Sequence, residues 1–441
     1  MAKIVSSPAT MWVQPPRPAP TGFANGAQTG SFDTATDTWT PGTSGGVVNQ
    51  ASWALVPSGR WVQVAGTRID GLTSTVVAAV PSWNASTLAW QSVMNAWNGF
   101  AIDGEKCRVW LVSAGGHADS SNNGIYRFDA YKMAWAVEKM PSDRAAWSDQ
   151  YRNLRPPQSG GYTMCYESTQ QRVAKAAAGT LSLTDDCDGD ELFWDRRPTS
   201  RHVYSSVVYV PASDELVMLC RRLWRFSLVA NEWTYKRRAP IPVDGAEVYG
   251  VHDERTNEYL FGGAGDGIYA SLSYNLSTNT WNNARWSPWS LYTGADVRVG
   301  RKVVFFNPVL GDRTNIFPGK YWTYDLDSRA IVNSGTGNVQ FAGGLSTQDF
   351  RGQYSPLYDG GCSLAYVPGL NRYWITLLMK TGMRWLQLDP TTTPWTLSPL
   401  TFQNEPPPTS DKPCRKTVYF ADLNAVLYFS SGDRPGYIYK L

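Results

Sequence analysis

A recurring spacing of aromatic and polar residues constrains this chain more than any other feature of its sequence. In the stretch IYRFDAYKMAW, the aromatic Phe128 precedes Asp129, and Trp135 follows six positions later. The same order recurs with Asp, Asn or Ser in the polar place, at positions 33, 84, 129, 227, 275, 325 and 389. In two variant copies, Ile331 takes the tryptophan place and Leu388 takes the aromatic place. A spacing that repeats along the whole chain indicates a repeated architecture rather than a single site.

Each copy also carries two apolar runs upstream, joined by a short polar turn, as in GFAIDGEKCRVWLVSAGG and CSLAYVPGLNRYWITLLM. Successive copies are 45 to 64 residues apart, except for one interval of 98 residues between Asp129 and Ser227, which is about two periods. That interval contains a further pair of runs, GYTMCYESTQQRVAKAAAG, at the start of residues 161–194. Each unit is interpreted as four strands, and the sequence predicts eight units, or seven if residues 161–194 do not form one.

A single four-stranded sheet of this size cannot bury both of its faces, whereas sheets packed around an axis bury them against their neighbours. The aromatic share of 13%, with 39 Gly and 28 Pro, favours short strands joined by tight turns. We expect the repeated tryptophan to fill the space between adjacent sheets, and the polar residue to begin the turn. The predicted fold class is therefore all-β, a single β-propeller of four-stranded blades.

The two ends of the chain carry complementary parts of one unit. The last residues, GYIYKL, are typical of a third strand without a fourth strand after it. The stretch SFDTATDTW, from Ser31 to Trp39, is typical of a third and a fourth strand without the first two. We therefore expect the N-terminal strand to complete the last blade and close the ring, which removes an exposed sheet edge. The predicted organisation is an extended Pro-rich arm over residues 1–28 and a β-propeller over residues 29–441.

Several units resemble the kelch repeat. YNLSTNTW, FDTATDTW and LDPTTTPW match its order of an aromatic residue, Asp or Asn, and Trp six positions later. The pairs Gly115–Gly116 and Gly262–Gly263 stand where kelch repeats carry a double glycine, and Arg201–His202 is similar to a feature of galactose-oxidase-like blades. The resemblance covers most of residues 30–441 and implies a kelch-type β-propeller. It implies no particular function, because propellers have many unrelated activities.

The sequence shows no recognisable catalytic set. It lacks GxSxG, HExxH, a phosphate-binding glycine loop and the SxDxGxTW Asp-box of sialidases. Its three histidines, His117, His202 and His252, lie in three different units, so a galactose-oxidase-like copper site is not expected. Each histidine is interpreted as a turn or strand-edge residue. We predict a non-enzymatic protein without an organic cofactor.

The acidic loop TDDCDGDE is a candidate calcium site. Asp186, Asp188 and Asp190 alternate along it, and alternating carboxylates on a tight loop can converge on one Ca²⁺ ion. Gly189 does not stand where an EF-hand loop requires its glycine. The alternative interpretation is a solvated acidic loop that pairs with nearby arginines.

Two further features are candidate partner-binding sites. The arm, with PPRPAP at its centre, favours an extended polyproline conformation, and we expect it to latch onto other subunits. Tryptophans outside the repeat are expected in loops, where aromatic faces can bind glycans, although packing onto the ring is the alternative. The predicted partner-binding residues are Trp12, Pro15, Pro16, Arg17, Trp147, Trp286 and Trp289.

Composition excludes several other classes of protein. The formal charge is +3 and the basic residues are scattered, so a nucleic-acid partner is not expected. No run of about 18 apolar residues predicts a membrane helix, and the N-terminus lacks the apolar segment of a signal peptide. The six cysteines lie far apart without a CxxC pair, as in reduced, buried thiols. The chain is expected to be made in the cytoplasm.

The leading functional hypothesis is a structural and interaction component of a larger assembly. The expected setting is a bacteriophage virion, in the tail or on the particle surface, with a role in host attachment. Its partners are expected to be other protein subunits, including further copies of itself. One alternative is a glycan-binding module or carbohydrate-active enzyme with a propeller fold, and a second is a cytosolic kelch adaptor.

Overall fold

The computed structural model describes most of the chain after residue 19. The described residues are 20–27, 29–95, 97–115, 120–143, 195, 197, 198, 200, 203–220, 222–238, 249–265, 268–282, 295–307, 319–350, 362–379, 381–407 and 414–441. Among these residues, no helix is long and apolar enough to cross a membrane.

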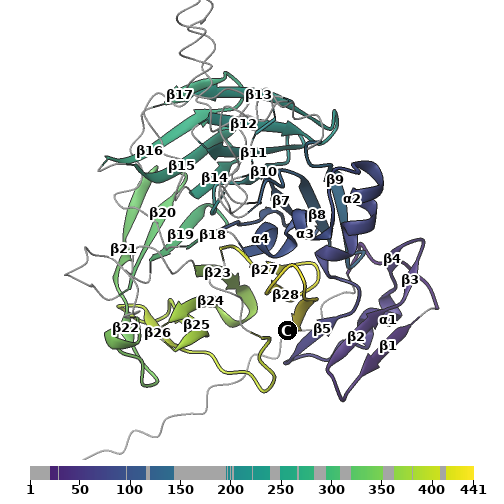
Figure 1. The fold of residues 1–441 in the computed structure, drawn as a ribbon. Coiled ribbons are helices and arrows are strands. Elements are labelled where there is room, and N and C mark those ends of the chain that lie inside the picture. Colours follow the sequence, from purple (N-terminus) through teal and green to yellow (C-terminus); the bar gives the residue numbers. More distant parts are fainter. Residues whose placement is uncertain are drawn as a thin grey trace, which may run out of the picture.

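Six of the seven sheets formed by the described strands are arranged around a central axis, so the fold is an all-β propeller (Figure 1), and the seventh is the two-stranded sheet of β3 (Thr43–Ser44) and β4 (Val47–Val48). Four of the sheets each contain four antiparallel strands in sequential order. The first contains β6 (Ala101–Asp103), β7 (Arg108–Val112), β8 (Ile125–Asp129) and β9 (Ala134–Lys139). The second contains β10 (Val208–Val210), β11 (Glu215–Cys220), β12 (Arg222–Ser227) and β13 (Glu232–Arg238). The third contains β14 (Tyr249–Asp253), β15 (Glu258–Gly265), β16 (Ile268–Asn275) and β17 (Thr280–Asn282). The fourth contains β18 (Ala295–Val299), β19 (Lys302–Asn307), β20 (Lys320–Asp325) and β21 (Ala330–Asn338).

The last two sheets have additional strands at their outer edges. The fifth sheet contains β23 (Cys362–Val367), β24 (Arg372–Met379), β25 (Gly382–Asp389), β26 (Thr396–Pro399) and β22 (Gln340–Phe341). The sixth contains β27 (Thr417–Phe420), β28 (Ala425–Phe429) and β29 (Gly436–Lys440), followed by β5 (Trp61–Val64), β2 (Thr38–Pro41) and β1 (Gly30–Asp33). The sixth sheet therefore combines strands from both ends of the chain.

The strand beside β29 is β5, in which Val62 lies opposite Ile438. The predicted segment, Ser31–Trp39, is in the same sheet but further out, because β2 pairs in parallel with β5 and β1 pairs with β2. N-terminal residues therefore join the last sheet, but β5 rather than Ser31–Trp39 lies beside β29.

The repeated polar residue begins the turn between the third and fourth strands, as predicted. Asp129 Oδ1 accepts a hydrogen bond from Tyr131 N at 3.1 Å, and Asn275 Oδ1 accepts from Ser277 N at 3.0 Å. The residue four positions after the polar one adopts a left-handed conformation, with φ between 48° and 56°, in five copies: Asp37, Met133, Asn231, Asn279 and Arg329. This local geometry explains why the spacing repeats.

The repeated tryptophan packs between adjacent sheets where its contacts can be followed. Trp135 lies 5.3 Å from Phe128 of its own sheet and 5.3 Å from Phe429 of the sixth sheet, measured between ring centroids. Trp395 stacks on Tyr321 of the fourth sheet at 4.2 Å, with an interplanar angle of 7°. The predicted position of this residue is confirmed in both copies.

The described residues form six blades, so the prediction of eight was wrong for this part of the chain. The copy with Trp83, Asn84 and Trp90, which was predicted to be part of a blade, instead lies in the connection between β5 and β6, residues 65–100. They contain four short helices: η1 (Ile69–Leu72), α2 (Thr73–Ala79), α3 (Ala85–Leu88) and α4 (Trp90–Asn95). The other missing unit, residues 161–194, lies outside the described residues.

Asn84 explains the first error. Its Oδ1 accepts a hydrogen bond from Thr87 N at 2.9 Å, and Thr87 Oγ1 accepts one from Asn84 N at 3.0 Å. This capping box begins α3. Because Asn both begins turns and caps helices, the same aromatic–Asn–Trp spacing occurs in a helical segment.

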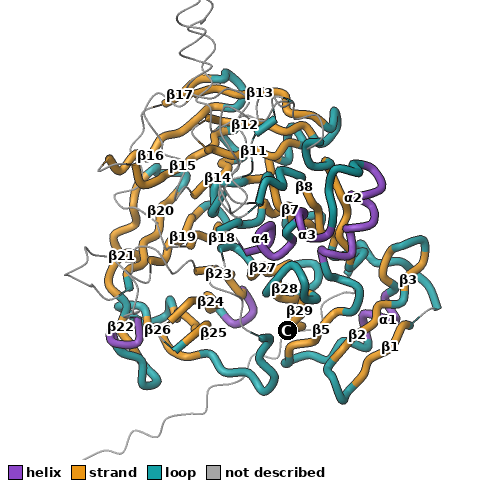
Figure 2. The backbone as a smooth tube through the Cα atoms, in the orientation of Figure 1, coloured by secondary structure: helices purple, strands orange, loops and turns teal. Residues whose placement is uncertain are grey.

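The helical connection packs between the first and sixth sheets (Figure 2). Gln91 Nε2 donates to Asp433 Oδ2 at 2.8 Å, and the Trp90 ring lies 4.9 Å from the Tyr126 ring. The remaining elements are α1 (Gln50–Ala54), β3 (Thr43–Ser44), β4 (Val47–Val48), η3 (Thr347–Phe350) and η4 (Pro368–Leu370). Cys107, Cys362 and Cys414 are buried thiols, as predicted.

Candidate ligand-binding channel

A cavity of about 850 Å³ lies at the axis of the propeller and is lined by residues from all six sheets. The innermost strand of each sheet contributes: β6, β10, β14, β18, β23 and β27. The lining extends from the first residues of these strands to the hairpin turns that follow them. We call this cavity the central channel.

One residue per blade forms a ring at the end of the channel nearest these turns. Each is the last but one residue of its innermost strand and lies opposite the second residue of the next strand, as Tyr209 does with Leu216. The six residues of this mouth ring are Ile102, Tyr209, His252, Arg298, Tyr366 and Tyr419. Six sheets with the same register thus bring together side chains that are far apart in the sequence.

Four residues of the mouth ring hold the hairpin that follows them. In each case a Tyr hydroxyl or a His ring nitrogen bonds the side chain of an Asp or Asn five positions later, which is left-handed with φ between 46° and 51°. The pairs are Tyr209 with Asp214 (2.8 Å), His252 with Asn257 (3.1 Å), Tyr366 with Asn371 (3.0 Å) and Tyr419 with Asn424 (3.0 Å).

This pairing corresponds to a regular spacing in the sequence. YVPASD, HDERTN, YVPGLN and YFADLN each place Asp or Asn five residues after Tyr or His. The side-chain bond orients the ring at the channel while the left-handed residue closes the turn. The same spacing would have identified four of the six residues in the mouth ring.

Arg415 forms the floor of the channel. It lies two residues before β27, and its side chain is only 10% exposed. Its Nη1 donates to Val207 O at 3.0 Å, its Nη2 donates to Gly250 O at 2.8 Å, and Nη2 also forms an ion pair with Asp296. These partners belong to the second, third and fourth sheets, so one guanidinium group connects four blades.

The backbone and charge around Arg415 fit this close packing. A Cβ atom at Gly250 would lie 2.4 Å from Ser206 O, so only glycine allows this approach of two innermost strands. Burial raises the pKa of Asp296, while the charge and hydrogen bonding of Arg415 oppose that change. The buried charge of Asp296 is therefore stabilised by Arg415, and the buried charge of Arg415 is stabilised by Asp296.

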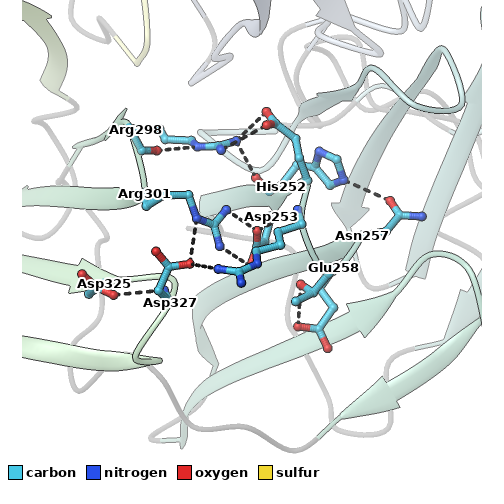
Figure 3. Close-up of polar contacts among 12 residues, drawn as sticks. His252, Asp253, Asn257, Glu258, Arg298, Arg301, Asp325 and Asp327 are labelled. Carbon is cyan, nitrogen blue, oxygen red and sulfur yellow. Dashed lines mark hydrogen bonds and ion pairs between the residues drawn. The ribbon is translucent and has the colours of Figure 1, made fainter.

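A network of ion pairs connects the third and fourth sheets beside the channel (Figure 3). Arg301 Nη1 lies 2.6 Å from Asp253 Oδ1, and Arg301 Nε lies 3.1 Å from Asp327 Oδ1. Arg298 binds both carboxylate oxygens of Glu254, at 2.7 and 3.2 Å. Burial raises the pKa of Asp253, but the hydrogen bonds from Arg301 and from Arg255 N lower it by more. The pKa of Asp253 is therefore below its usual value. We call these residues the charged seam: Asp253, Glu254, Arg298, Arg301 and Asp327.

The site residues predicted from the sequence lie outside the described residues. These are the candidate calcium ligands Asp186, Asp188 and Asp190 and the candidate partner-binding residues Trp12, Pro15, Pro16, Arg17, Trp147, Trp286 and Trp289. Their roles stay predictions. Within the described ranges, no three His, Cys, Asp or Glu side chains are grouped closely enough to hold a metal ion.

Comparison with known proteins adds little. No protein-family model matches the chain, and no curated protein matches it. One solved structure that matches is the crystal structure of TolB from Acinetobacter baumannii, at a TM-score of 0.32 and 8% identity. The match covers 65% of this chain and 53% of that chain, so this chain spans about half the length of the TolB structure. Similarity at this level carries no argument, and the propeller assignment depends on the six sheets.

Proposed function

We propose that this chain is a kelch-type propeller, closed into a ring by β5, that acts without enzymatic activity as a structural and interaction component of a larger assembly. The repeated Asp or Asn turn and the inter-sheet tryptophan support the kelch assignment. The pairing of β5 with β29 supports closure, since it joins residues near the two ends of the chain. A bacteriophage virion, in the tail or on the particle surface, is the proposed setting.

The observation that carries this proposal is that charged side chains around the axis form ion pairs between neighbouring sheets. Arg415 connects four sheets, and Asp253, Asp296 and Glu254 each form an ion pair with an arginine. A general acid or base needs a carboxyl group that can exchange a proton with a substrate. Carboxylates that are paired across blades instead make a rigid platform, which suits a scaffold for other proteins.

The anchoring of the N-terminal segment supports an interaction role. Phe23 packs between Trp53, at 5.4 Å, and Tyr131, at 5.6 Å between ring centroids. Thr21 N donates to Asp422 Oδ2 at 3.1 Å, and Asp422 lines the central channel. The arm is therefore attached at a fixed point beside the hairpin turns. A Pro-rich arm with a fixed base is well suited to bind a neighbouring subunit.

Light scattering on the purified chain tests this proposal. We expect the full chain to form a defined oligomer and the chain without residues 1–18 to be a monomer. This deletion keeps Thr21 and Phe23, which belong to the folded part, so a change in mass reports on the arm alone. A control chain in which Gly and Ser replace residues 12–17 keeps the arm length and should also be a monomer. A full chain that is monomeric and binds no other virion protein would contradict the proposal.

Glycan recognition is the second candidate, because Trp147, Trp286 and Trp289 are loop aromatics outside the repeat. A glycan array that gives specific binding, lost in Trp147→Ala and Trp286→Ala, would favour it. Calcium at Asp186, Asp188 and Asp190 is likewise proposed. It is tested by calorimetry with Ca²⁺ on the wild type and on Asp188→Asn.

A further inference from the structure

The mouth of the central channel presents accessible apolar, aromatic and acidic side chains. In the mouth ring, Ile102 is 37% exposed, and Tyr366 and Tyr419 are partly exposed. The hairpin turns beside the ring carry carboxylates: the Glu254 side chain is 57% exposed, and Glu105 is also exposed. All five residues line the cavity, so a partner at this end of the channel can contact them directly.

Contacts between neighbouring blades bring these hairpin turns together. Tyr131 Oη donates to Asp422 Oδ2 at 2.7 Å, and Cys107 Sγ lies 3.5 Å from Tyr131 Oη, so turns of the first and sixth sheets meet. Arg298 of the fourth sheet pairs with Glu254 of the third sheet at 2.7 Å. Together with the shared lining, these contacts make the mouth one binding surface rather than six separate turns.

The lining of the channel is acidic. It contains five carboxylates against two arginines: Asp103, Glu105, Glu254, Asp296 and Asp422, with Arg298 and Arg415. Lys106 adds one positive charge at the mouth, where its Nζ lies 3.4 Å from Tyr209 Oη. Negative charge still exceeds positive charge, so the channel attracts a basic partner.

The N-terminal segment leaves the described part of the chain on the same face as the mouth. In the sheets of four sequential antiparallel strands, the turns after the first and third strands lie at one end of the blade, and the other connections lie at the opposite end. The internal gaps after residue 29 fall in those other connections, between second and third strands or between sheets, as at residues 308–318 and 239–248. Thr21, by contrast, bonds Asp422 in the hairpin turn after β27.

The composition of residues 1–19 complements the mouth. This segment contains Lys3 and Arg17 but no Asp or Glu, and it combines Trp12 with a cluster of prolines. Pro-rich segments bind aromatic-lined grooves in an extended conformation that costs little entropy to fix. A basic, Pro-rich segment is therefore attached at the rim of an acidic mouth that contains tyrosine rings.

The expected stiffness of this segment favours the mouth of a second copy over the chain's own mouth. A polyproline segment rises about 3.1 Å per residue, so the stretch from Trp12 to Pro20 would span about 25 Å. That length exceeds the width of a compact cavity of about 850 Å³. An extended arm therefore carries Trp12 past the channel beside which it is attached.

We propose that residues 1–19 of one copy bind at the mouth of the central channel of a second copy. Trp12 and the prolines pack on the tyrosine rings of the mouth ring, and Arg17 pairs with the carboxylates of the hairpin turns. This inference rests on the proposed function, because it identifies the surface that the arm binds within the assembly.

A peptide of residues 1–19 tests binding without oligomerisation. Its fluorescence anisotropy is measured with the chain that lacks residues 1–18, whose mouth has no arm of its own. We expect saturable binding that weakens as NaCl is raised from 50 to 500 mM. A peptide with Gly in place of Pro15, Pro16 and Pro18 keeps both cations and should bind at least about five-fold more weakly. Absence of binding up to 1 mM protein would overturn the proposal.

Two charge reversals locate the peptide at the mouth. In the mouth variant, Glu105→Lys and Glu254→Lys are combined, and the affinity for the peptide should fall at least about ten-fold. The control combines Glu232→Lys and Glu405→Lys, which change the net charge equally at exposed residues outside the lining, and it should bind as the parent chain does. Equal affinity of the two variants, with circular dichroism showing both folded, would overturn the proposal.

Mixing two chains shows which copy supplies the arm. The full-length mouth variant has an arm but a weakened mouth, and the chain without residues 1–18 has an intact mouth but no arm. Each should be monomeric alone, and light scattering of the mixture should show a complex of two chains. A mixture that stays monomeric, although the peptide binds, would mean that the arm occupies its own mouth, and it would overturn the commitment to a second copy.

The same variants separate failure of this proposal from failure of the proposed function. If the full chain oligomerises through its arm and the full-length mouth variant oligomerises equally, the arm binds another surface. The scaffold role then stands and the mouth proposal is overturned. A wild-type full chain that is monomeric contradicts the scaffold role instead, and the peptide titration still decides whether the mouth binds the arm.

Discussion

Two junctions between adjacent sheets of this propeller differ in their polar content: one is mainly aromatic, and the other adds a network of ion pairs to a buried apolar cluster. Between the fifth and sixth sheets, Trp61 is 1% exposed and its ring lies 5.0 Å from Trp385, 5.6 Å from Phe402 and 5.4 Å from Tyr439. We call this contact the aromatic seam: Trp61, Trp374, Trp385, Phe402, Tyr428 and Tyr439. Between the third and fourth sheets, the charged seam places Arg298 and Arg301 about one third exposed against carboxylates.

The two seams also differ in how far apart in the sequence their segments lie. The aromatic seam includes Trp61 from β5, which is more than 300 residues away from Trp374 and Trp385 in sequence. Burial of these aromatic rings supplies a large, non-directional free energy that holds the distant segments together. The third and fourth sheets are consecutive in the chain and also share a buried apolar cluster, in which the Tyr249 ring lies 5.1 Å from the Phe305 ring, so the partly exposed ion pairs add to an apolar contact.

The largest effect is expected from Trp61→Ala. The substitution removes the ring at the centre of the aromatic seam and should lower the free energy of unfolding by about 3–5 kcal/mol. Urea denaturation measures it, and the loss should be similar in 0.1 and 1 M NaCl because no charge changes. Val229→Ala, at a side chain that is 81% exposed, is the control and should have little effect. A loss below about 1 kcal/mol would contradict this view of the seam.

A smaller loss is expected in the charged seam from Arg301→Gln. Asp253 has a side chain only 2% exposed and would lose its arginine, which should cost about 1–3 kcal/mol. Arg255→Gln is the matched control, since Arg255 also pairs with Asp327 but is 72% exposed, and it should cost less than about 0.5 kcal/mol. If urea denaturation gave equal losses of unfolding free energy for the two variants, burial of Asp253 would not increase the strength of its ion pair.

Lys416 places a titratable group in a third seam, between the sixth and first sheets. Its Nζ lies 4.8 Å from the centre of the Phe100 ring, and burial lowers its pKa from 10.5 to about 7. Between these pH values the unfolded chain binds more protons than the folded chain, so stability should rise with pH. The slope contributed is at most about 1.4 kcal/mol per pH unit.

Lys416→Met removes this slope and should stabilise the protein most below pH 7, where the buried amine is charged. Urea denaturation of the wild type and the variant from pH 6 to 9 gives the difference directly. Lys302→Met, at an exposed residue, is the control and should leave the slope unchanged. A difference that does not change with pH would show that Lys416 does not titrate in this range.

The smallest effect is expected from Tyr366→Phe in the mouth ring. It keeps the ring but removes the hydroxyl that donates to Asn371, at a cost of about 0.5–1.5 kcal/mol. Tyr439→Phe removes a hydroxyl outside the four hairpin pairs and serves as the control. If thermal unfolding gives the same midpoint for both variants, the Tyr–Asn bond does not stabilise the hairpin.

Features that depend on a few neighbouring residues could be predicted from the sequence. The turn at Asp129 and the packing of Trp135 follow from one short spacing, and both are confirmed. The blade count could not be predicted in this way, because Asn84 has the same spacing and caps a helix. The pairing of β5 with β29 depends on tertiary packing, so the sequence indicated the N-terminal region but not the strand.

The candidate site was harder to predict, because its residues come together only when six innermost strands occupy the same position in their sheets. Ile102 and Arg298 have no common motif, and they share a ring because each is the last but one residue of an innermost strand. Arg415 could not be identified from the sequence, because a single arginine before a strand matches no motif. The five-residue spacing from Tyr366 to Asn371 is visible in the sequence, and it would have identified four residues of the mouth ring.

Closure of the ring by β5 is tested most directly by a disulfide between Gln63→Cys and Tyr437→Cys, which lie opposite each other in the two strands. We predict that mild oxidation links residues 63 and 437 in high yield, as read by mass spectrometry of proteolytic peptides. The pair Gln63→Cys and Ile438→Cys is shifted by one residue and places the thiols on opposite faces, so it should not form the bond. Absence of the 63–437 bond, or equal yields from both pairs, would contradict closure by this strand.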